Sequence, residues 1–555
     1  VVSSSSPVVA EFSLLMSSSK DSSSSLCAKT LWFRWDLRLD DNLALATACR
    51  TGSSLLPVYV FDPRHFNMPT LAGARKSSAR RARFLLESVT NLRRSLEARG
   101  SGLAVFVGRP EEILPEVCQE CQEVVVQEAV CSEEQIVQRK LAKRLKDCKL
   151  TRVWGGSMYM PDDCGCSPDN IPLLFTSFKN KAEGRGRIQN PVDAPERMPP
   201  LPSLSEGDAL SFLPTLQHLG YAEEEAAAAV EDDPRGVMRF EGGEDAAMHR
   251  LQKWMFQDDK LKDYFDIRNG MLGDGYSSKL SPWLALGCIS PRRVWKAAQK
   301  YEKERVKNKS TYWLIFELTW RDFFIFMARS QGDKIFVPGG IIGDRTPWHG
   351  SPDALLRWKD GRTGDPLVDA NMRELKVTGF MSNRGRQNVA SYLIFDLGVD
   401  WRYGAAHFEE HLLDYDPCSN WGNWVAAAGL TGQRVNKFNT KKQLNDYDPR
   451  REYVKRWLDS GSPSAPHQNA RSDHNPAPEV NDEQAAKMQA RAERFGTGRG
   501  GGGGSESRGG YPYNKGKGKG GGGKGKSGRD GGFDSVPRKQ ARWRKADPPE
   551  MALGA

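Results

Sequence analysis

Apolar runs alternate with helical patterns through the first third of the chain. Four short runs have the length and composition of strands: Leu31–Phe33, Leu55–Phe61, Leu103–Val107 and Glu123–Val126. Helical patterns at residues 79–99 and 133–146 alternate with them. This order predicts a parallel sheet with helices on both faces. We therefore expect a Rossmann-like α/β domain over residues 30–165, although without the GxGxxG loop of a dinucleotide site.

The pattern changes twice after this domain. Residues 166–235 are rich in proline and glycine, with five prolines between Pro191 and Pro202, which predicts a long connector wrapped over the surface. Helical periodicity dominates residues 236–460, for example at residues 248–256, 290–303, 312–330 and 372–379. The expected fold class is an α/β domain followed by an all-helical domain.

Charge sets the last part of the chain apart. The whole chain carries a formal net charge of +10, and residues 496–545 alone hold 13 Lys and Arg against 3 Asp and Glu. With 19 glycines between Gly496 and Gly532, residues 461–555 are expected to form a disordered basic tail. Such a tail favours binding to single-stranded DNA or to RNA, and a solubilising extension is the alternative.

Residues 1–29 form a serine-rich extension. The first thirty residues hold 12 Ser, two acidic residues and no Arg. This composition fits a transit peptide and predicts a chloroplast and/or mitochondrial location, whereas the missing Arg favours a plain extension on a nuclear or cytoplasmic protein. No run of 18 apolar residues is present, so no membrane span is expected. We expect a monomer.

Two groups of residues have spacings that occur in metal sites. Cys118 with Cys121 and Cys164 with Cys166 are too loosely spaced for a tight zinc motif, and ten cysteines without a secretory signal indicate reduced thiols. Residues 407–411 fit the HxxEH pattern of zinc hydrolases. Polar residues on a helix are the simpler interpretation of that pattern, so we expect no metal.

Residues 414–424 have the chemistry of a site for a flat aromatic ligand. This run packs two carboxylates, two amides and two indoles into eleven residues. Indoles are costly to expose, and buried Asp and Asn need hydrogen-bond partners. Upstream, residues 276–287 begin a helix with serines and Lys279, which suits a diphosphate. A plain N-cap by Ser281 ahead of Pro282 is the alternative.

These segments resemble motifs of the photolyase/cryptochrome family, most of all its cryptochrome DASH branch. The matching residues are Tyr264 with Arg268, Ser277–Ser281, Glu317–Arg321, Asp369–Leu375, Thr378–Arg386 and Asp414–Trp424. The resemblance spans roughly residues 31–458. It implies a blue-light-absorbing flavoprotein of the deoxyribodipyrimidine photolyase type, with non-covalent FAD in the helical domain.

The resemblance implies a set of FAD-binding residues, namely Tyr264, Ser277, Ser278, Lys279, Leu280, Ser281, Arg321, Arg386, Asp414, Tyr415, Asp416 and Asn420. Ser277–Ser281 correspond to the diphosphate motif, and Asp414 and Asp416 to residues at the pyrimidine edge of the flavin and its neighbouring groups. Asn420 corresponds to the residue facing flavin N5. A neutral amide there cannot donate a titratable proton, which favours photolyase-type chemistry over signalling by flavin protonation.

Three tryptophans match the family's electron-transfer chain. Trp424, Trp401 and Trp348 stand at the family's spacing and would relay an electron to the excited flavin. A structural role is the alternative for any of them.

The family's substrate pocket corresponds to Glu317, Trp320, Asn383 and Arg384. By this resemblance, Trp320 stacks on a flipped pyrimidine dimer, Glu317 and Asn383 hydrogen-bond its bases, and Arg384 holds a phosphate. Ala426 stands where photolyases carry a second stacking Trp and cryptochrome DASH proteins usually a Tyr. Its small side chain weakens the expected capture of a dimer, most of all from duplex DNA.

An antenna and two functions complete the expectations. Glu128 corresponds to the family glutamate that contacts a 5,10-methenyltetrahydrofolate antenna, and a loop carboxylate is the alternative. The first function is repair of cyclobutane pyrimidine dimers, chiefly in single-stranded DNA, by electron transfer from photoexcited reduced FAD. The second is a blue-light photoreceptor or nucleic-acid-binding cryptochrome with little or no repair.

Overall fold

The computed structural model describes residues 29–459, apart from residues 51–53, 72, 74, 120, 203–207, 346 and 436. The serine-rich extension and the basic tail expected above lie outside the described residues. Among the helices within that range, none is long and apolar enough to span a membrane.

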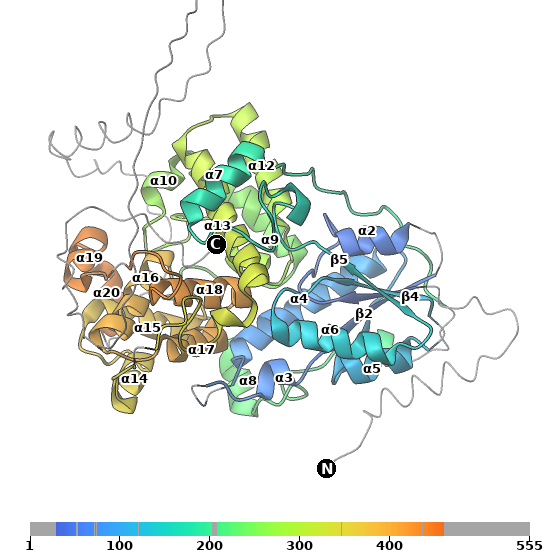
Figure 1. Ribbon diagram of the computed structural model, residues 1–555, viewed down its shortest axis with the longest axis horizontal. Coiled ribbons are helices and arrows are strands. Elements are labelled where there is room, and N and C mark those ends of the chain that lie inside the picture. The colour runs from blue at the N-terminus through green and yellow to red at the C-terminus, as the bar shows by residue number, and fades with distance from the viewer. Residues whose placement is uncertain are drawn as a thin grey trace, which may run out of the picture. The chain divides into compact units, whose positions relative to one another are not determined.

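The first part of the chain forms a parallel sheet of order β3-β2-β1-β4-β5 (Figure 1). The strands are β1 (Lys29–Phe33), β2 (Leu55–Phe61), β3 (Ala104–Val107), β4 (Glu123–Gln127) and β5 (Lys149–Val153). The register places Leu31 beside Pro57 on one side and beside Val125 on the other. The hydrophobic pattern missed β5, because this edge strand has the polar sequence KLTRV and no buried residue.

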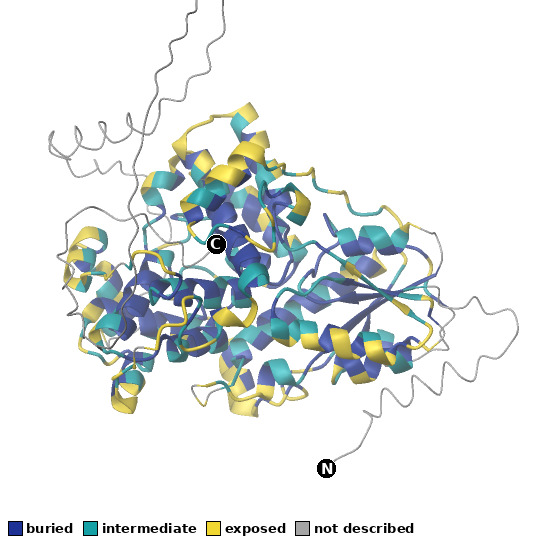
Figure 2. Ribbon diagram, viewed as in Figure 1, coloured by how far each residue is buried: buried dark blue, intermediate teal, exposed yellow. Residues whose placement is uncertain are grey.

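Helices cover both faces of the sheet, as expected for parallel strands. α5 (Pro110–Val117) and α6 (Ser132–Arg144) pack on the face that carries Trp32 and Val124. α2 (Leu43–Cys49) and α4 (Ala79–Glu97) pack on the opposite face, which carries Phe33 and Val125, and the short α3 (Arg64–Asn67) follows β2. Figure 2 shows buried positions along the strands between these helices, and β5 at the edge has none. The α/β prediction is confirmed.

The connector contains two helices that its proline content concealed. α7 (Phe175–Arg185) buries Phe175 and Phe178 and packs against α13 (Lys309–Gln331). α8 (Glu223–Val230) packs against α4. Residues 186–202 are irregular, as their prolines predict. Part of the connector is therefore a packed layer of the fold, and only part of it runs over the surface.

The remainder of the described chain is helical, as predicted. Its other helices are α9 (Glu244–Gln252), α10 (Tyr264–Ile267), α11 (Ser281–Ala285), α12 (Pro291–Glu304), α14 (Pro352–Lys359), α15 (Pro366–Thr378), α16 (Asn383–Ser391), α17 (Trp401–His411), α18 (Pro417–Ala427), α19 (Thr440–Tyr447) and α20 (Glu452–Leu458). Two π-helical segments, η3 (Lys253–Gln257) and η6 (Tyr392–Asp396), continue α9 and α16. α13 is buried along most of its length and forms the centre of this part.

Buried polar contacts join the sheet to the helical part. Arg292 of α12 donates to both carboxylate oxygens of Asp41, at 2.7 and 3.0 Å, and the two side chains are 2% and 0% exposed. Asp322 of α13 accepts hydrogen bonds from the backbone N–H groups of Met158 and Tyr159. One hydrophobic cluster also runs from Leu31 to Trp424. The two parts therefore share a core.

Replacing Arg292 by Met should destabilise the fold strongly, because the Asp41 carboxylate would remain buried without its cation. The expected loss in unfolding free energy is about 3–5 kcal/mol, measured by urea unfolding followed by circular dichroism. Arg293→Met is the matched control, since Arg293 pairs with Asp40 and Asp193 at a more exposed position. It should lose at most about 1 kcal/mol. Equal losses in the two variants would contradict a special role for the buried pair.

Candidate functional site

A pocket opens in the helical part between α10, α13, α16 and the loop before α11. Its atom-free volume is about 740 Å³, which includes open solvent at the mouth. The residues that line it include Tyr264, Arg268, Tyr276, Ser277, Ser278, Lys279, Leu280, Ser281, Glu317, Phe380, Ser382, Asn383 and Arg386. The pocket thus brings the expected diphosphate loop together with two of the expected substrate residues.

Arg250 of α9 holds the Ser277–Ser281 loop from behind. Its guanidinium donates to the backbone carbonyls of Asp274, Ser277 and Ser278 at 2.6, 3.1 and 2.9 Å. The sequence analysis missed Arg250. In the sequence, Arg250 is marked only as an arginine on the apolar side of an amphipathic helix. That position alone does not predict contact with the Ser277–Ser281 loop.

Lys279 carries a buried charge that the described residues do not neutralise. The side chain is 3% exposed, and its ammonium has no hydrogen-bond partner among them. It lies 3.1 Å from the centre of the Tyr276 ring, and the backbone there is left-handed, with φ of 54°. Burial, and next the nearby Arg250, lower the pKa of Lys279 well below its usual value. An anionic ligand in the pocket would satisfy this cation.

The helix after this loop differs from the expectation. α11 has only five residues, begins at Ser281 and has Leu280 in the N-cap position, without a side-chain cap. So short a helix has a small dipole, because few peptide units add to it. Attraction for a diphosphate at this loop therefore depends on Lys279 more than on the helix.

Arg386 and Asp414 form a second buried centre of charge. A guanidinium nitrogen of Arg386 donates to Asp414 Oδ2 at 2.7 Å, and the side chains are 5% and 2% exposed. Arg386 Nε donates to the carbonyl of Met381. The other carboxylate oxygen, Asp414 Oδ1, is buried with no hydrogen-bond partner among the described residues. It is available to an N–H group of a ligand.

The other expected flavin residues lie in different surroundings. Asn420 is buried in α18, and its amide nitrogen donates to the carbonyl of Ala405 at 3.0 Å. Asp416 caps α18 by accepting the N–H of Ser419, and Tyr415 lies beneath the guanidinium of Arg81. Arg321 donates to the backbone carbonyls of Gly156 and Leu284. Asp416 and Arg321 line a separate pocket described below, so the structure does not bring all twelve residues together.

Glu317 is held in place by Trp313 of the same helix and by Arg268, which lines the pocket. Trp313 Nε1 donates to Glu317 Oε1 at 2.9 Å, and Arg268 lies 3.7 Å from the same oxygen. Trp313 was missed by the sequence analysis, although it stands four residues before Glu317 on the same helix, a spacing that brings two side chains together. The carboxylate is thus positioned along one wall of the pocket.

Two of the expected substrate residues are engaged elsewhere. The indole of Trp320 stacks on Phe175 of α7, with ring centres 3.5 Å apart and planes at 8°. Arg384 is 3% exposed and donates to the side-chain oxygens of Asn269, Gln387 and Gln443. The role of Arg384 at a DNA phosphate stays a prediction.

The three expected electron-transfer tryptophans run from the interior outward. Trp424 and Trp401 are fully buried, and Trp348 is partly buried. Trp424 packs against α17 at Gly404, where a Cβ would lie 2.2 Å from the indole, and Trp401 begins the same helix. Trp424 also meets Trp358 edge-on, with ring centres 6.3 Å apart. Trp358 and Phe408, whose ring centre lies 5.1 Å from that of Trp424, are therefore aromatic neighbours that the sequence did not predict.

Glu128 lines a different pocket, where the sheet meets α13 and α18. Trp35, Glu134, Arg321, Asp416 and the facing thiols of Cys131 and Cys418, whose sulfurs are 3.6 Å apart, line it with Glu128. Burial raises the pKa of Glu134 to about 7. The indole N–H of Trp35 and one carboxylate oxygen of Glu134 are buried with no partner among the described residues. These groups suit a ligand that is aromatic and polar.

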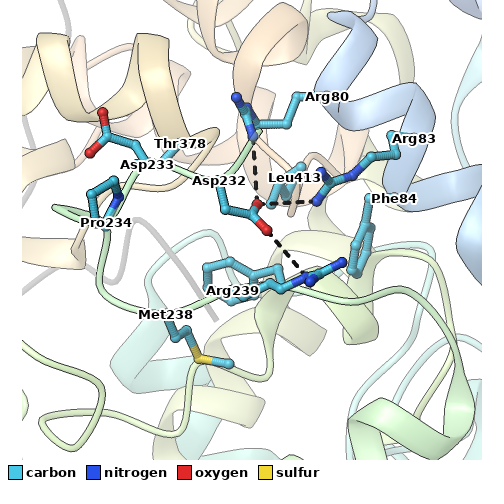
Figure 3. A pocket seen from close by; sticks show the side chains of 12 residues that line it. Arg80, Arg83, Phe84, Asp232, Asp233, Pro234, Met238, Arg239, Thr378 and Leu413 are labelled. Atoms are coloured by element: carbon cyan, nitrogen blue, oxygen red, sulfur yellow. Dashed lines mark hydrogen bonds and ion pairs between the residues drawn. The ribbon is translucent and has the colours of Figure 1, made fainter. Parts of the chain in front are cut away.

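A third cavity lies between α4 and the segment before α9 (Figure 3). Arg80, Arg83 and Arg239 surround Asp232 at distances of 3.8, 3.4 and 3.2 Å. Arg80 and Arg83 also donate to backbone carbonyls near the end of α8. These arginines already have partners within the protein. Their contacts hold α4 against the connector, so we assign the cavity no ligand.

Among the described residues, potential metal ligands gather at one place, formed by His407, Glu410 and His411. The four cysteines considered above do not form such a group there. Cys164 and Cys166 contact each other, and Cys118 donates to the hydroxyl of Thr30.

Comparison with known proteins agrees with this architecture. Residues 30–200 match the family described as DNA photolyase, and residues 313–494 match the FAD binding domain of DNA photolyase. A relative from Ostreococcus tauri, named cryptochrome DASH, chloroplastic/mitochondrial, is 45% identical over 77% of this chain and 83% of its own. A cryptochrome DASH from Gloeobacter violaceus is 45% identical over 77% and 85%.

A solved cryptochrome from Synechocystis superposes with a TM-score of 0.73 at 42% identity, covering 78% of this chain and 88% of that one. The chain therefore belongs to the photolyase/cryptochrome family. Within that family it is a homologue of the cryptochrome DASH proteins, which are photolyase-related flavoproteins with an FAD-binding domain.

The pocket in the helical part fits FAD. The unsatisfied Lys279 ammonium suits a diphosphate, and the open oxygen of Asp414 suits a ring N–H group. Both groups would otherwise remain buried at a cost in free energy. Arg386, which lines the pocket with Lys279, joins it to Asp414, which is not itself a lining residue.

Lys279→Met should have opposite effects on the FAD-free protein and on FAD binding. Without FAD at pH 7, the variant should melt at a higher temperature than the wild type, because the cost of burying the Lys279 amine without a hydrogen-bond partner is gone. The lowered pKa means that the unfolded chain binds more protons, so wild-type stability rises with pH and the difference shrinks towards pH 10. FAD affinity should fall about 10- to 100-fold. Melting curves and FAD titration measure both effects. A lower melting point without FAD, or unchanged affinity, would contradict this account.

Proposed function

We propose that the chain repairs cyclobutane pyrimidine dimers, chiefly in single-stranded DNA, with FAD bound in the pocket lined by Ser277–Ser281. When bound and reduced, FAD supplies the light-driven electron that splits the dimer. The observation that carries this proposal is that Glu317 and Asn383 line the same pocket as the diphosphate loop. Substrate and cofactor would then meet in one cavity.

Each part of the pocket has a task in this proposal. Lys279 holds the diphosphate, and Asp414, oriented by Arg386, accepts a hydrogen bond from the ring system. Glu317, oriented by Trp313 and Arg268, hydrogen-bonds the dimer bases together with Asn383. Asn420 keeps a neutral amide near the ring, and such a group cannot supply a titratable proton. Burial keeps bulk water from these groups, which strengthens each electrostatic contact.

Reduction of FAD would proceed through Trp424, Trp401 and Trp348. Trp348 is partly buried whereas Trp401 and Trp424 are both fully buried, which supports a route from the surface to the interior. Gly404 contributes by allowing the Trp424 indole to lie directly on α17.

Trp424→Phe should slow photoreduction of FAD sharply under blue light with an external reductant, because Phe fills similar space but is far harder to oxidise. Trp358→Phe is the matched control, since Trp358 is also fully buried and lies beside Trp424. That variant should keep nearly the wild-type rate. Absorbance at the flavin band follows both reactions, and FAD content should be unchanged in each. An equal slowing in the control would move the route to Trp358.

A photoreceptor or nucleic-acid-binding cryptochrome with little repair is the second candidate. Two observations favour it. Trp320 already stacks on Phe175, so its ring face has a partner within the protein. Ala426, half-buried on α18, offers no ring for a flipped base. The basic tail beyond the described residues would then supply contact with single-stranded DNA or RNA.

Repair assays on one dimer-containing oligonucleotide distinguish the candidates. We expect repair of the single strand under blue light and little or none of the duplex, because flipping a base out costs a few kcal/mol. Ala426→Tyr should strengthen binding of the dimer by about 1–3 kcal/mol, whereas Ala426→Ser, which adds no ring, should not. Equal repair of both substrates would contradict the account of base flipping. No repair of the single strand would favour the photoreceptor.

The remaining proposals are an antenna and a location. Glu128 and its neighbours Trp35 and Glu134 support 5,10-methenyltetrahydrofolate as the occupant of their pocket. The relatives from Ostreococcus tauri and Arabidopsis thaliana are named chloroplastic/mitochondrial, which supports an organellar location for this chain. We also propose that it acts as a monomer.

A further inference from the structure

His407, Glu410 and His411 form a cluster near the end of α17 that takes no part in the function proposed above. Their ligand atoms all lie within 4.8 Å of one another. The two imidazole rings have centres 4.5 Å apart, and Glu410 Oε2 lies 3.8 Å from His407 Nδ1 and 3.5 Å from His411 Nε2. Successive turns of one helix place the three side chains together.

His407 is the unusual member of this cluster. The side chain is 3% exposed, yet neither ring nitrogen has a hydrogen-bond partner among the described residues. Its neighbour Trp358, with ring centres 5.5 Å apart, gives its own indole N–H to the carbonyl of Val389. A buried imidazole without partners is unfavourable, because it loses the hydrogen bonds that water would supply. Such a side chain calls for a ligand.

We propose that His407, Glu410 and His411 bind a divalent transition-metal ion of the zinc type. Two imidazole nitrogens and one carboxylate oxygen are donors that zinc accepts, and three protein donors leave one position for water. Donors around tetrahedral zinc lie about 3.4 Å apart. Small rotations of Glu410 and His411, both partly exposed, bring the cluster to that spacing around a fixed His407.

Charged side chains of neighbouring elements also act on the cluster. Lys359, Lys376 and Arg75 are the cations that act on the cluster, and the Glu410 carboxylate opposes them.

The proposed site is not a hydrolase centre. In the HxxEH pattern of zinc hydrolases the glutamate acts as the general base. Here Glu410 lies between the two histidines and serves as a ligand. A bound ion would instead fix the end of α17, whose Glu410 carbonyl accepts the N–H of Ser78 at the start of α4.

The test uses the FAD-bound full chain, made without a histidine tag, stripped with a chelator and titrated with Zn²⁺. One equivalent should bind, and Co²⁺ in its place should give visible d–d absorption bands. His411→Ala and His407→Phe should each weaken Zn²⁺ binding by about tenfold or more and remove the Co²⁺ bands. His249→Ala, an exposed histidine outside the cluster, is the matched control and should bind as the wild type does.

Lys359→Gln gives a second measurement in case the buried His407 variant does not fold. Removing this cation should tighten Zn²⁺ binding, because it acts against charge at the cluster. Binding that survives His411→Ala unchanged, or a wild-type protein that takes up no Zn²⁺ and shows no Co²⁺ bands, would overturn the proposal. Both outcomes leave flavin binding and photoreduction untouched.

Discussion

Buried charge without a matching partner is the constraint on which the helical half depends. Lys279 is enclosed with no acceptor among the described residues, and Asp414 uses only one of its two oxygens on Arg386. An uncompensated ion in an apolar interior is costly, and proteins seldom retain one without use. Lys279 and Asp414 cost free energy when they have no partner. The same two groups make binding specific, because a ligand must present an anionic group to one and an N–H group to the other. Stability and recognition here have one physical origin.

The two proposed functions, repair and light sensing, differ in one requirement. Repair needs aromatic rings that can stack on a base, and such stacking is weaker where a ring already stacks on another side chain. Glu317 lines the pocket, and Trp313 and Arg268 lie against its carboxylate. Trp320, one turn further along α13, is covered by Phe175 of the connector. A ring that is already stacked gains less from a second partner on the same face. The connector helix α7 therefore covers one face of Trp320, although its sequence suggested only a link.

The sequence predicted those features that local patterns of side chains determine. Alternation of apolar runs and amphipathic helices predicted the parallel sheet and the helical half, and the motif spacing predicted that Ser277–Ser281 and Glu317 would meet. It failed where tertiary contacts decide the outcome. β5 carries polar residues because it lies at an edge, and α7 is hidden among prolines but is stabilised by Phe175 and Phe178 against α13. Arg384 contacts the amides of Asn269 and Gln443, which come from distant parts of the chain. No local pattern reveals such contacts.

The Asp41–Arg292 pair has a consequence for biosynthesis. A ribosome completes the sheet, from Lys29 to Val153, long before it reaches Arg292. Until then, the Asp41 carboxylate has no guanidinium from α12, and Met158 and Tyr159 lack the carboxylate of Asp322. The nascent N-terminal half must therefore keep this surface hydrated and incompletely packed while it waits for the helices. The N-terminal half therefore completes its packing only after the helical half has been synthesised. A pause in translation between the two halves would prolong the exposure of the unpacked surface to chaperones and proteases.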